Sequence, residues 1–195
     1  MRILLTLFFM VFAGYASAGS LARIETYLNT LASAQADFRQ YNADGSESHG
    51  RLALLRPGRI RFDYADPDTS VVLAAAGALY IYDRAGDPQP EVYPLSRTPF
   101  DFLLQRQLDL KTPGLVQSVK PLDGGRILLR AGVPDAPDSG TLDLVFNQSP
   151  MQLIAWVLRT EDGSTTLVEL DNLVENPELD SHQFTRESIT PELGR

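Results

Sequence analysis

The sequence of 195 residues predicts a mainly β (α+β) protein, in which one helix precedes an antiparallel meander of about ten or eleven short strands that closes toward a barrel. Two observations predict this fold class. Apolar residues recur at helical spacing near the start of the chain, and from Phe38 onward they alternate with a period of two. Turn-forming residues separate the alternating runs at the spacing of hairpins. Neither a repeat nor a linker divides the chain, so we expect a single domain.

The first 18 residues have the pattern of a secretory signal peptide. Arg2 gives a positive start, residues 3–15 (ILLTLFFMVFAGY) are almost wholly apolar, and Ala16-Ser17-Ala18 has the small-x-small form that signal peptidase cuts. The alternative is a membrane anchor, but the run is shorter than the roughly 20 residues that span a bilayer. We therefore expect cleavage after Ala18, a signal peptide at 1–18, one domain at 19–195, and location in the periplasm.

The predicted helix begins at Ser20, a suitable N-cap, and ends near Ser33. Its apolar stripe consists of Leu21, Ile24, Leu28 and Leu31. Strands are predicted at 36–41, 51–55, 59–64, 70–75, 79–83, 90–93, 116–121, 126–131, 141–147, 152–160 and 165–173. A second, short helical stretch is predicted at 98–107 (TPFDFLLQRQ), where Thr98 can cap and Pro99 suits a first turn.

Several predicted strands are apolar on both faces. In 59–64 the alternation is clean, so we expect Ile60, Phe62 and Tyr64 on one face, with Arg59, Arg61 and Asp63 in solvent on the other. The runs 70–73, 79–82 and 153–158 are instead apolar throughout, so something must cover their second face. A tightly packed barrel core and an apolar cavity both fit this pattern.

Composition argues against an enzyme and against nucleic-acid binding. The chain has no Cys and only two His, His49 and His182, and no Gly-x-Ser-x-Gly motif or P-loop is present. The carboxylates of 66–68 and 161–163 stand where turns favour Asp. The net charge of −8 does not suit binding to phosphate backbones. We expect no catalytic residue, no metal site, no cofactor and no nucleic-acid partner.

An ordered set of short motifs resembles the LolA family of periplasmic carriers of outer-membrane lipoproteins. The longest is residues 55–67 (LRPGRIRFDYADP), with an Arg-Pro step, an alternating aromatic strand and a turn ending in Pro. The similarity continues through 70–73, the aromatic strand 79–83 (LYIYD) and Thr98-Pro99-Phe100. The opening helix followed by 36–40 (ADFRQ) and the late Phe184 are similar too, so the resemblance covers nearly the whole chain after residue 18.

The resemblance implies an unclosed antiparallel β-barrel around a hydrophobic cavity, with helices as a lid. It implies that the cargo is an acylated lipoprotein, the donor the inner-membrane ABC transporter LolCDE and the acceptor the outer-membrane receptor LolB. We expect a monomer. It also implies that Arg56 holds the lid closed by hydrogen bonds to lid backbone. The expected lipid-contacting residues are Ile60, Phe62, Tyr64, Val72, Ile81 and Phe146 in the wall and Phe100, Leu103 and Leu104 in the lid. A lipid-sensing or lipid-binding regulator on the same fold is the alternative function.

Overall fold

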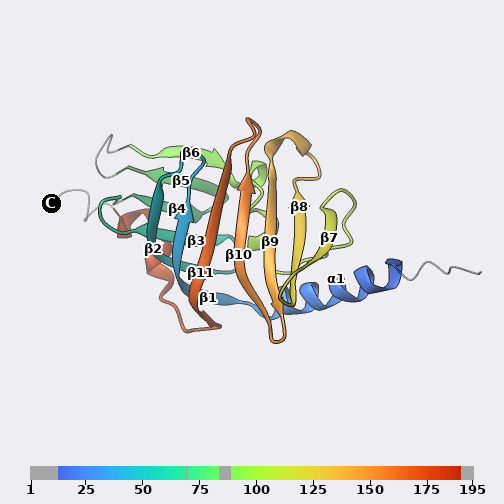
Figure 1. Cartoon of the computed structure of the whole chain (residues 1–195). Coiled ribbons are helices and arrows are strands. Elements are labelled where there is room, and N and C mark those ends of the chain that lie inside the picture. The colour runs from blue at the N-terminus through green and yellow to red at the C-terminus, as the bar shows by residue number, and fades with distance from the viewer. Residues whose placement is uncertain (1–12, 69, 84–88, 190–195) are drawn as a thin grey trace, which may run out of the picture.

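The computed structural model describes residues 13–68, 70–83 and 89–189 of the chain. Within them, one helix, α1, is followed by a single antiparallel sheet of 11 strands in the order β6-β5-β4-β3-β2-β1-β11-β10-β9-β8-β7 (Figure 1). The first and last strands pair in the middle of the sheet, and β6 and β7 form its two edges. Because these edges do not pair with each other, the barrel is unclosed, as predicted.

All the predicted strands are present, with differences at their ends. Their bounds are β1 Ser33–Tyr41, β2 Glu47–Leu55, β3 Arg59–Tyr64, β4 Val71–Ala75, β5 Ala78–Tyr82, β6 Glu91–Pro94, β7 Val116–Leu122, β8 Arg126–Gly132, β9 Thr141–Gln148, β10 Met151–Arg159 and β11 Thr165–Glu175. The start of β2 differs most. Its first residues are polar, which hid them from the prediction, but they continue the ladder with β1 as far as the pair Tyr41 and Glu47.

The predicted opening helix is α1, Ala13–Thr30, which lies along the inner side of the sheet near β7 and β10. It begins before Ser20 and ends before Ser33, which is already the first residue of β1. Residues 1–12 of the predicted signal peptide lie outside the described residues, and cleavage after Ala18 stays a prediction. No helix in the described part of the chain is both long and apolar enough to cross a membrane.

The predicted helix at 98–107 is wrong in its type and length. The structure has two separate 3-10 turns here, η1 Leu95–Arg97 and η2 Phe102–Leu104. The hydroxyl of Thr98 bonds back to the carbonyl of Leu95, so it caps nothing that follows, and Gln105 is extended. Residues 102–104 are consecutive and all three are buried. A surface helix would bury only one face, so this run does not have the burial pattern of the predicted helix.

The sheet curls until its two halves meet. Phe62 on β3 and Trp156 on β10 are separated in the sheet by β2, β1 and β11, yet their ring centroids lie 6.1 Å apart on the concave side. Phe38 on β1 lies between these halves and contacts Phe62 edge to face at 5.5 Å. The main apolar core therefore occupies the inside of the curled sheet, together with α1.

A second apolar cluster lies on the convex side of β2 to β5. The C-terminal segment, residues 177–189, contains the 3-10 turns η4 Ser181–Phe184 and η5 Arg186–Ser188. It packs Phe184 and Ile189 onto Ala53, Val71, Leu73 and Tyr82. This segment explains why β4 and β5 are apolar on both faces, because each face of these strands is covered by a different part of the chain.

The expectation that Arg61 contacts solvent is wrong. Arg61 is only 7% exposed, because the C-terminal segment covers it. Its guanidinium pairs with Asp63 at 2.7 Å and donates to the carbonyl of Gln183 and the hydroxyl of Ser188, both at 2.8 Å. Arg61 therefore ties the C-terminal segment to the outside of β3.

Candidate functional site: an apolar interior closed by a lid segment

The concave side of the sheet carries an apolar wall that contains the predicted wall residues. Phe62 on β3 lies across from Val72 on β4, which lies across from Ile81 on β5, so these three residues form a row. Ile60 and Tyr64 stand on the same face of β3 as Phe62. Ile60 and Phe62 are buried and Tyr64 is half-buried, so this part of the wall faces inward as predicted.

The other half of the sheet turns its apolar face toward α1. Phe146 on β9 is fully buried and contacts Tyr27 of α1 edge to face, with ring centroids 5.9 Å apart. The Tyr27 hydroxyl donates to Glu175 at 2.9 Å and accepts from the backbone N–H of Leu153 at 3.1 Å. Burial raises the pKa of Tyr27 well above its ordinary value, so the phenol stays neutral. Tyr27 thus fixes α1 to β10 and β11.

The lid segment, residues 95–115, joins β6 to β7 and fills the rest of the interior. Its buried apolar side chains are Leu95, Phe102, Leu103, Leu104, Leu108, Leu110 and Leu115. Phe100 is half-buried, and its ring lies 6.4 Å from that of Phe62 and 6.2 Å from that of Trp156. Phe100 therefore rests on both halves of the wall at once, and the predicted lid residues all face the apolar interior.

Two polar side chains of α1 hold the lid segment by its backbone. The amide of Asn29 donates to the carbonyl of Leu108 at 2.9 Å and accepts from the N–H of the same residue at 2.7 Å. One turn earlier, Glu25 accepts from the N–H of Leu110 at 2.8 Å. These three bonds satisfy backbone groups that the lid segment buries outside any regular ladder.

Arg56 lies where β2 ends, between α1 and the lid segment. Its side chain is buried at 9% exposure, and Nη1 donates to the carbonyl of Leu28 in the last turn of α1. Its backbone N–H bonds to Ala32, and the N–H of Gly58 bonds to the carbonyl of Leu104 in the lid segment at 2.7 Å. Burial lowers the pKa of the guanidinium to about 10, so it stays a cation at neutral pH. The expected hydrogen bonds from the Arg56 side chain to lid backbone are therefore not found among the described residues. The side-chain bond reaches α1, and the link to the lid segment runs through the Gly58 N–H.

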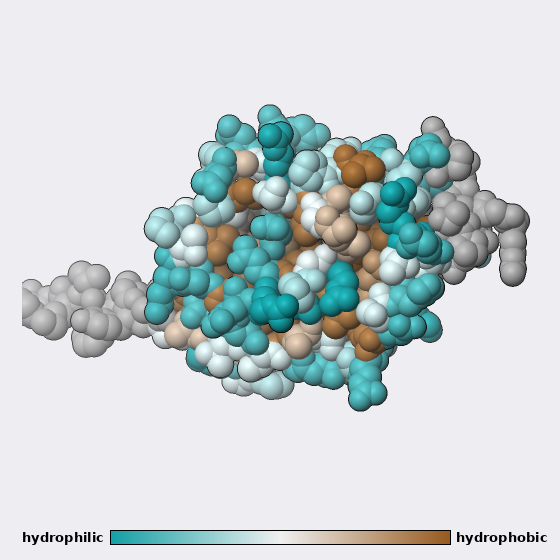
Figure 2. All heavy atoms as spheres, turned by 180° about the vertical axis from the view of Figure 1, so that it is seen from behind, coloured by the Kyte–Doolittle hydropathy of each residue, from teal (hydrophilic) through white to brown (hydrophobic). Residues whose placement is uncertain are grey.

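The lid segment borders a small pocket. A pocket of about 70 Å³ lies between it and the end of β8, lined by residues that include Pro99, Phe102 and Gly132. Sites for small ligands usually measure about 300–1,000 Å³. On the face opposite to the view of Figure 1, apolar surface is visible only in patches between polar groups (Figure 2). This pocket is too small to hold an acyl chain in the present arrangement of the lid segment.

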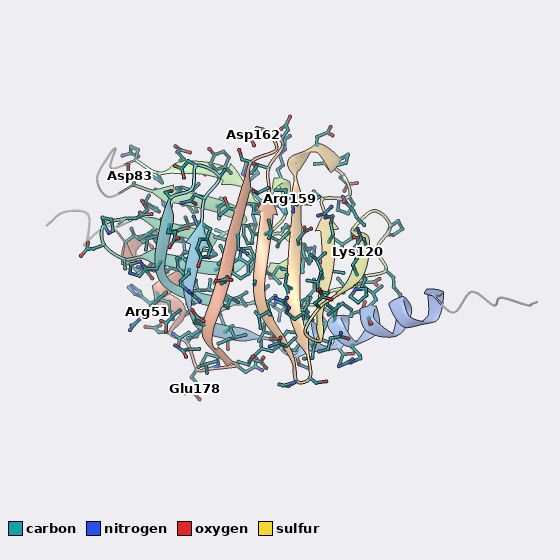
Figure 3. All side chains as sticks on the ribbon, viewed as in Figure 1. Arg51, Asp83, Lys120, Arg159, Asp162 and Glu178 are labelled. Atoms are coloured by element: carbon teal, nitrogen blue, oxygen red, sulfur yellow. The ribbon has the colours of Figure 1, made fainter. Side chains whose placement is uncertain are left out.

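Charged side chains stand on the outside of β1, β2 and β7 to β11, beside half-buried apolar ones such as Leu128 and Val145. Arg51, Lys120 and Arg159 point outward from β2, β7 and β10 (Figure 3), while one neighbour of each, Leu52, Val119 and Leu158, is part of the inner core or packs against it. Asp143 on β9, only 1% exposed, pairs with Arg130 at 2.6 Å and with Arg159 at 3.4 Å. The buried carboxylate on this face is therefore paired with arginines of the same face.

Sequence analysis missed three residues of this arrangement. Trp156 stood in a run that is apolar throughout, so its face was not assigned, although a single Trp in a strand is itself a signal for a core position. Asn29 and Glu25 carried no signal, because a polar residue on a helix is ordinarily solvated. Their role follows only from the path of the lid segment.

Comparison with known proteins identifies the family. Residues 29–187 match the family model described as "Outer membrane lipoprotein carrier protein LolA". The chain belongs to the LolA family. An outer-membrane lipoprotein carrier protein of Coxiella burnetii is 26% identical to it over 98% of this chain and 88% of that protein. A LolA-family protein of Halorhodospira halophila with the same description is 27% identical over 87% of this chain and 82% of its own.

A solved structure has the same fold. It is a domain from Vibrio parahaemolyticus assigned to outer-membrane lipoprotein sorting, with a TM-score of 0.53 and 11% identity, and the match covers 88% of this chain and 97% of that one. The predicted LolA resemblance and the unclosed barrel are thereby confirmed. The family is described as one of carriers, which supports the prediction that the protein is not an enzyme.

Proposed function

We propose that this LolA-family protein is a periplasmic chaperone that binds the acyl chains of lipoproteins released from the inner membrane and carries them to the outer membrane. The observation that carries the proposal is the position of the lid segment. Phe100, Leu103 and Leu104 lie against an apolar wall inside a curled sheet, where acyl chains could replace them. The names of the relatives from Coxiella and Halorhodospira support the same role.

The energetics of carriage favour an interior that the protein itself can refill. Burying an acyl chain gains about 0.8 kcal/mol per CH2, so each chain gains on the order of 10 kcal/mol over water. A carrier that held an empty apolar cavity would release such cargo very slowly. A lid segment that packs into the vacated wall offsets much of this gain, because release of the acyl chains restores the contacts of Phe100, Leu103 and Leu104.

Arg56 is proposed as the latch of the closed state. Its bond to Leu28 holds α1, and the Gly58 N–H in the turn that follows it holds Leu104. Cargo that displaces the lid segment would break the contact between Gly58 and Leu104, and closing would remake it. The wall residues Ile60, Phe62, Tyr64, Val72, Ile81 and Phe146 would receive the acyl chains.

The proposed partners follow from this role. The donor is LolCDE in the inner membrane and the acceptor is LolB at the outer membrane, and the protein acts as a monomer. A net charge of −8 would keep such a carrier from adhering to anionic bilayer surfaces. The protein is proposed to be exported to the periplasm with cleavage of its signal peptide after Ala18, and mass spectrometry of the protein from periplasmic extract should show Gly19 as its first residue.

Cargo isolated with the protein tests the proposal. The full chain is produced in a Gram-negative host, purified from the periplasm without detergent, and its bound molecules are identified by mass spectrometry. Intact acylated lipoprotein is the expected result, and it should be accepted from LolCDE-containing inner-membrane vesicles in an ATP-dependent manner. Free lipid without lipoprotein would contradict the chaperone and favour the lipid-sensing or lipid-binding regulator.

A further inference from the structure

Arg56 differs from Arg61 and Arg130, each of which binds a carboxylate with two nitrogen atoms of its guanidinium. Arg61 and Arg130 present the same edge of the guanidinium, Nε and Nη2, to Asp63 and Asp143, with distances of 2.6–2.9 Å. In Arg56 these two nitrogen atoms are buried and have no hydrogen-bond acceptor among the described residues. Only Nη1 is used, on the carbonyl of Leu28. The open edge of Arg56 is thus the edge that the other two give to a carboxylate.

An open edge on a buried cation is costly. Removing a charge from water without a partner is unfavourable, and buried ions in proteins are ordinarily paired. Burial lowers the pKa of Arg56, because removal from water disfavours the charged form of the guanidinium. The two parallel N–H groups of Nε and Nη2 match the two oxygen atoms of a carboxylate or a phosphodiester. The missing partner therefore has the chemistry of an oxyanion.

The position of Arg56 next to the apolar interior indicates that the oxyanion would be the head group of an apolar chain. Arg56 follows β2, whose Leu52 and Leu54 belong to the inner core, and Gly58 two residues later bonds to Leu104 of η2. A ligand that displaced η2 would lay an apolar chain along the wall and bring its head to the end of β2. The acylated end of a lipoprotein has ester, amide and thioether groups but no charge, so it does not supply this oxyanion.

We propose that Arg56 binds the oxyanion of a free acyl lipid, either a fatty-acid carboxylate or a phospholipid phosphodiester, whose chain takes the place of the lid side chains. The inference rests on the lid displacement of the proposed function, but it adds a second class of ligand that competes with lipoprotein for the same interior. The open edge of the guanidinium selects this ligand by its charge.

A fluorescent fatty acid and its uncharged ester test the proposal on the intact protein. cis-Parinaric acid should bind more tightly than its methyl ester by about tenfold to a hundredfold, the difference expected for hydrogen bonds to a charged group. Arg56→Gln, which removes the charge, should abolish this preference. Arg56→Lys, which keeps the charge but loses the two-pronged edge, should reduce it. Arg106→Gln removes an exposed charge from the lid segment and should leave the preference unchanged.

The possible outcomes distinguish failure of this inference from failure of the proposed carrier function. Equal binding of acid and ester by the unmodified protein would overturn the role of Arg56 and leave the apolar interior in place. Binding of neither would overturn the inference and also contradict an interior that opens for acyl chains. A preference that survives in Arg56→Gln would overturn it as well.

Competition then identifies the source of the oxyanion. Palmitate displacing bound parinarate at lower concentration than phosphatidylglycerol would assign a fatty acid, and the reverse order would assign a phospholipid. Diacylglycerol, which has the chains of a phospholipid without its phosphate, should compete least. Displacement by diacylglycerol as effective as by both charged lipids would overturn the proposal.

Discussion

At the scale of the residue, Arg56 and the turn after it connect three parts of the chain through single hydrogen bonds. The side chain reaches Leu28 in α1, its own N–H reaches Ala32, and the N–H of Gly58 reaches Leu104 in the lid segment. A hydrogen bond to a charged group contributes about 1.5–3 kcal/mol. Equilibria between two conformations are usually set by a few kcal/mol. We propose that Arg56 biases the lid indirectly, by holding α1 next to the turn whose Gly58 N–H bonds to Leu104.

Arg56→Leu should therefore separate loading from release. Acceptance of lipoprotein from inner-membrane vesicles should persist, because the apolar wall is unchanged and the closed form that competes with cargo is weaker. Hand-off to a LolB-type receptor should fall by about tenfold or more, because closing of the empty lid returns less free energy. The measurement is a two-step transfer assay with each step scored by immunoblotting. Arg106→Leu, which changes an exposed residue of the lid segment, is the control. Loss of loading with hand-off preserved, or no effect on either step, would mean that Arg56 is not the latch.

Asn29 is the second residue on which the closed lid depends. Asn29→Ala should lower the free energy of unfolding by about 1–3 kcal/mol, because it leaves the N–H and the carbonyl of buried Leu108 without partners. Urea titration measures this loss, and binding of an environment-sensitive apolar dye should rise in the same variant. Thr26→Ala, on an exposed part of α1, should change neither. A stable variant with unchanged dye binding would show that Asn29 does not hold the lid segment.

At the scale of the element, the strands could be predicted from the sequence because their signals are local. Alternation in 59–64 and turn residues such as those at 66–68 act over a few positions, and β3 has the predicted bounds. The C-terminal segment could not be predicted in this way. Its buried or half-buried residues Leu179, Phe184 and Ile189 stand five positions apart, a spacing of neither helix nor strand, among polar neighbours. Arg61 is buried because that segment covers it, so its burial could not be predicted without the path of the segment.

The C-terminal segment should stabilise the fold from outside, without touching the interior. Phe184→Ala should cost about 3–5 kcal/mol in the free energy of unfolding, since Phe184 is a buried member of the convex cluster. Apolar-dye binding at low denaturant should not change, because the lid contacts lie on the other side of the sheet. Urea unfolding followed by circular dichroism gives the first quantity. His182→Ala, exposed in the same turn, is the control, and a loss of stability as large as that of Phe184→Ala would contradict the assigned packing.

At the scale of the whole molecule, the interior is made by three distant parts of one chain. α1 enters from the start of the sequence, the lid segment from its middle, and the wall from both halves of the sheet. Most of the residues proposed for the lid and the wall could be expected in the apolar interior from the sequence, because they are apolar and follow recognisable motifs. The packing of the interior could not be predicted from the sequence, because it depends on how far the sheet curls. This curl brings Phe62 and Trp156 together across three intervening strands.

Trp156 makes the state of the whole interior measurable, because it is the only Trp in the sequence and is buried against Phe62 and Phe100. A triacylated lipopeptide with brominated acyl chains should quench its fluorescence, since quenching by bromine requires near contact and places the chains where Phe100 lay. The same lipopeptide without bromine should shift the emission but not quench it. Phe100→Ala removes the ring that contacts both halves of the wall and that the acyl chains must displace. The lipopeptide concentration that gives half-maximal quenching should therefore be lower in this variant. Unquenched emission from a protein that has demonstrably bound the brominated lipopeptide would place the acyl chains outside the curled sheet and overturn the carrier mechanism.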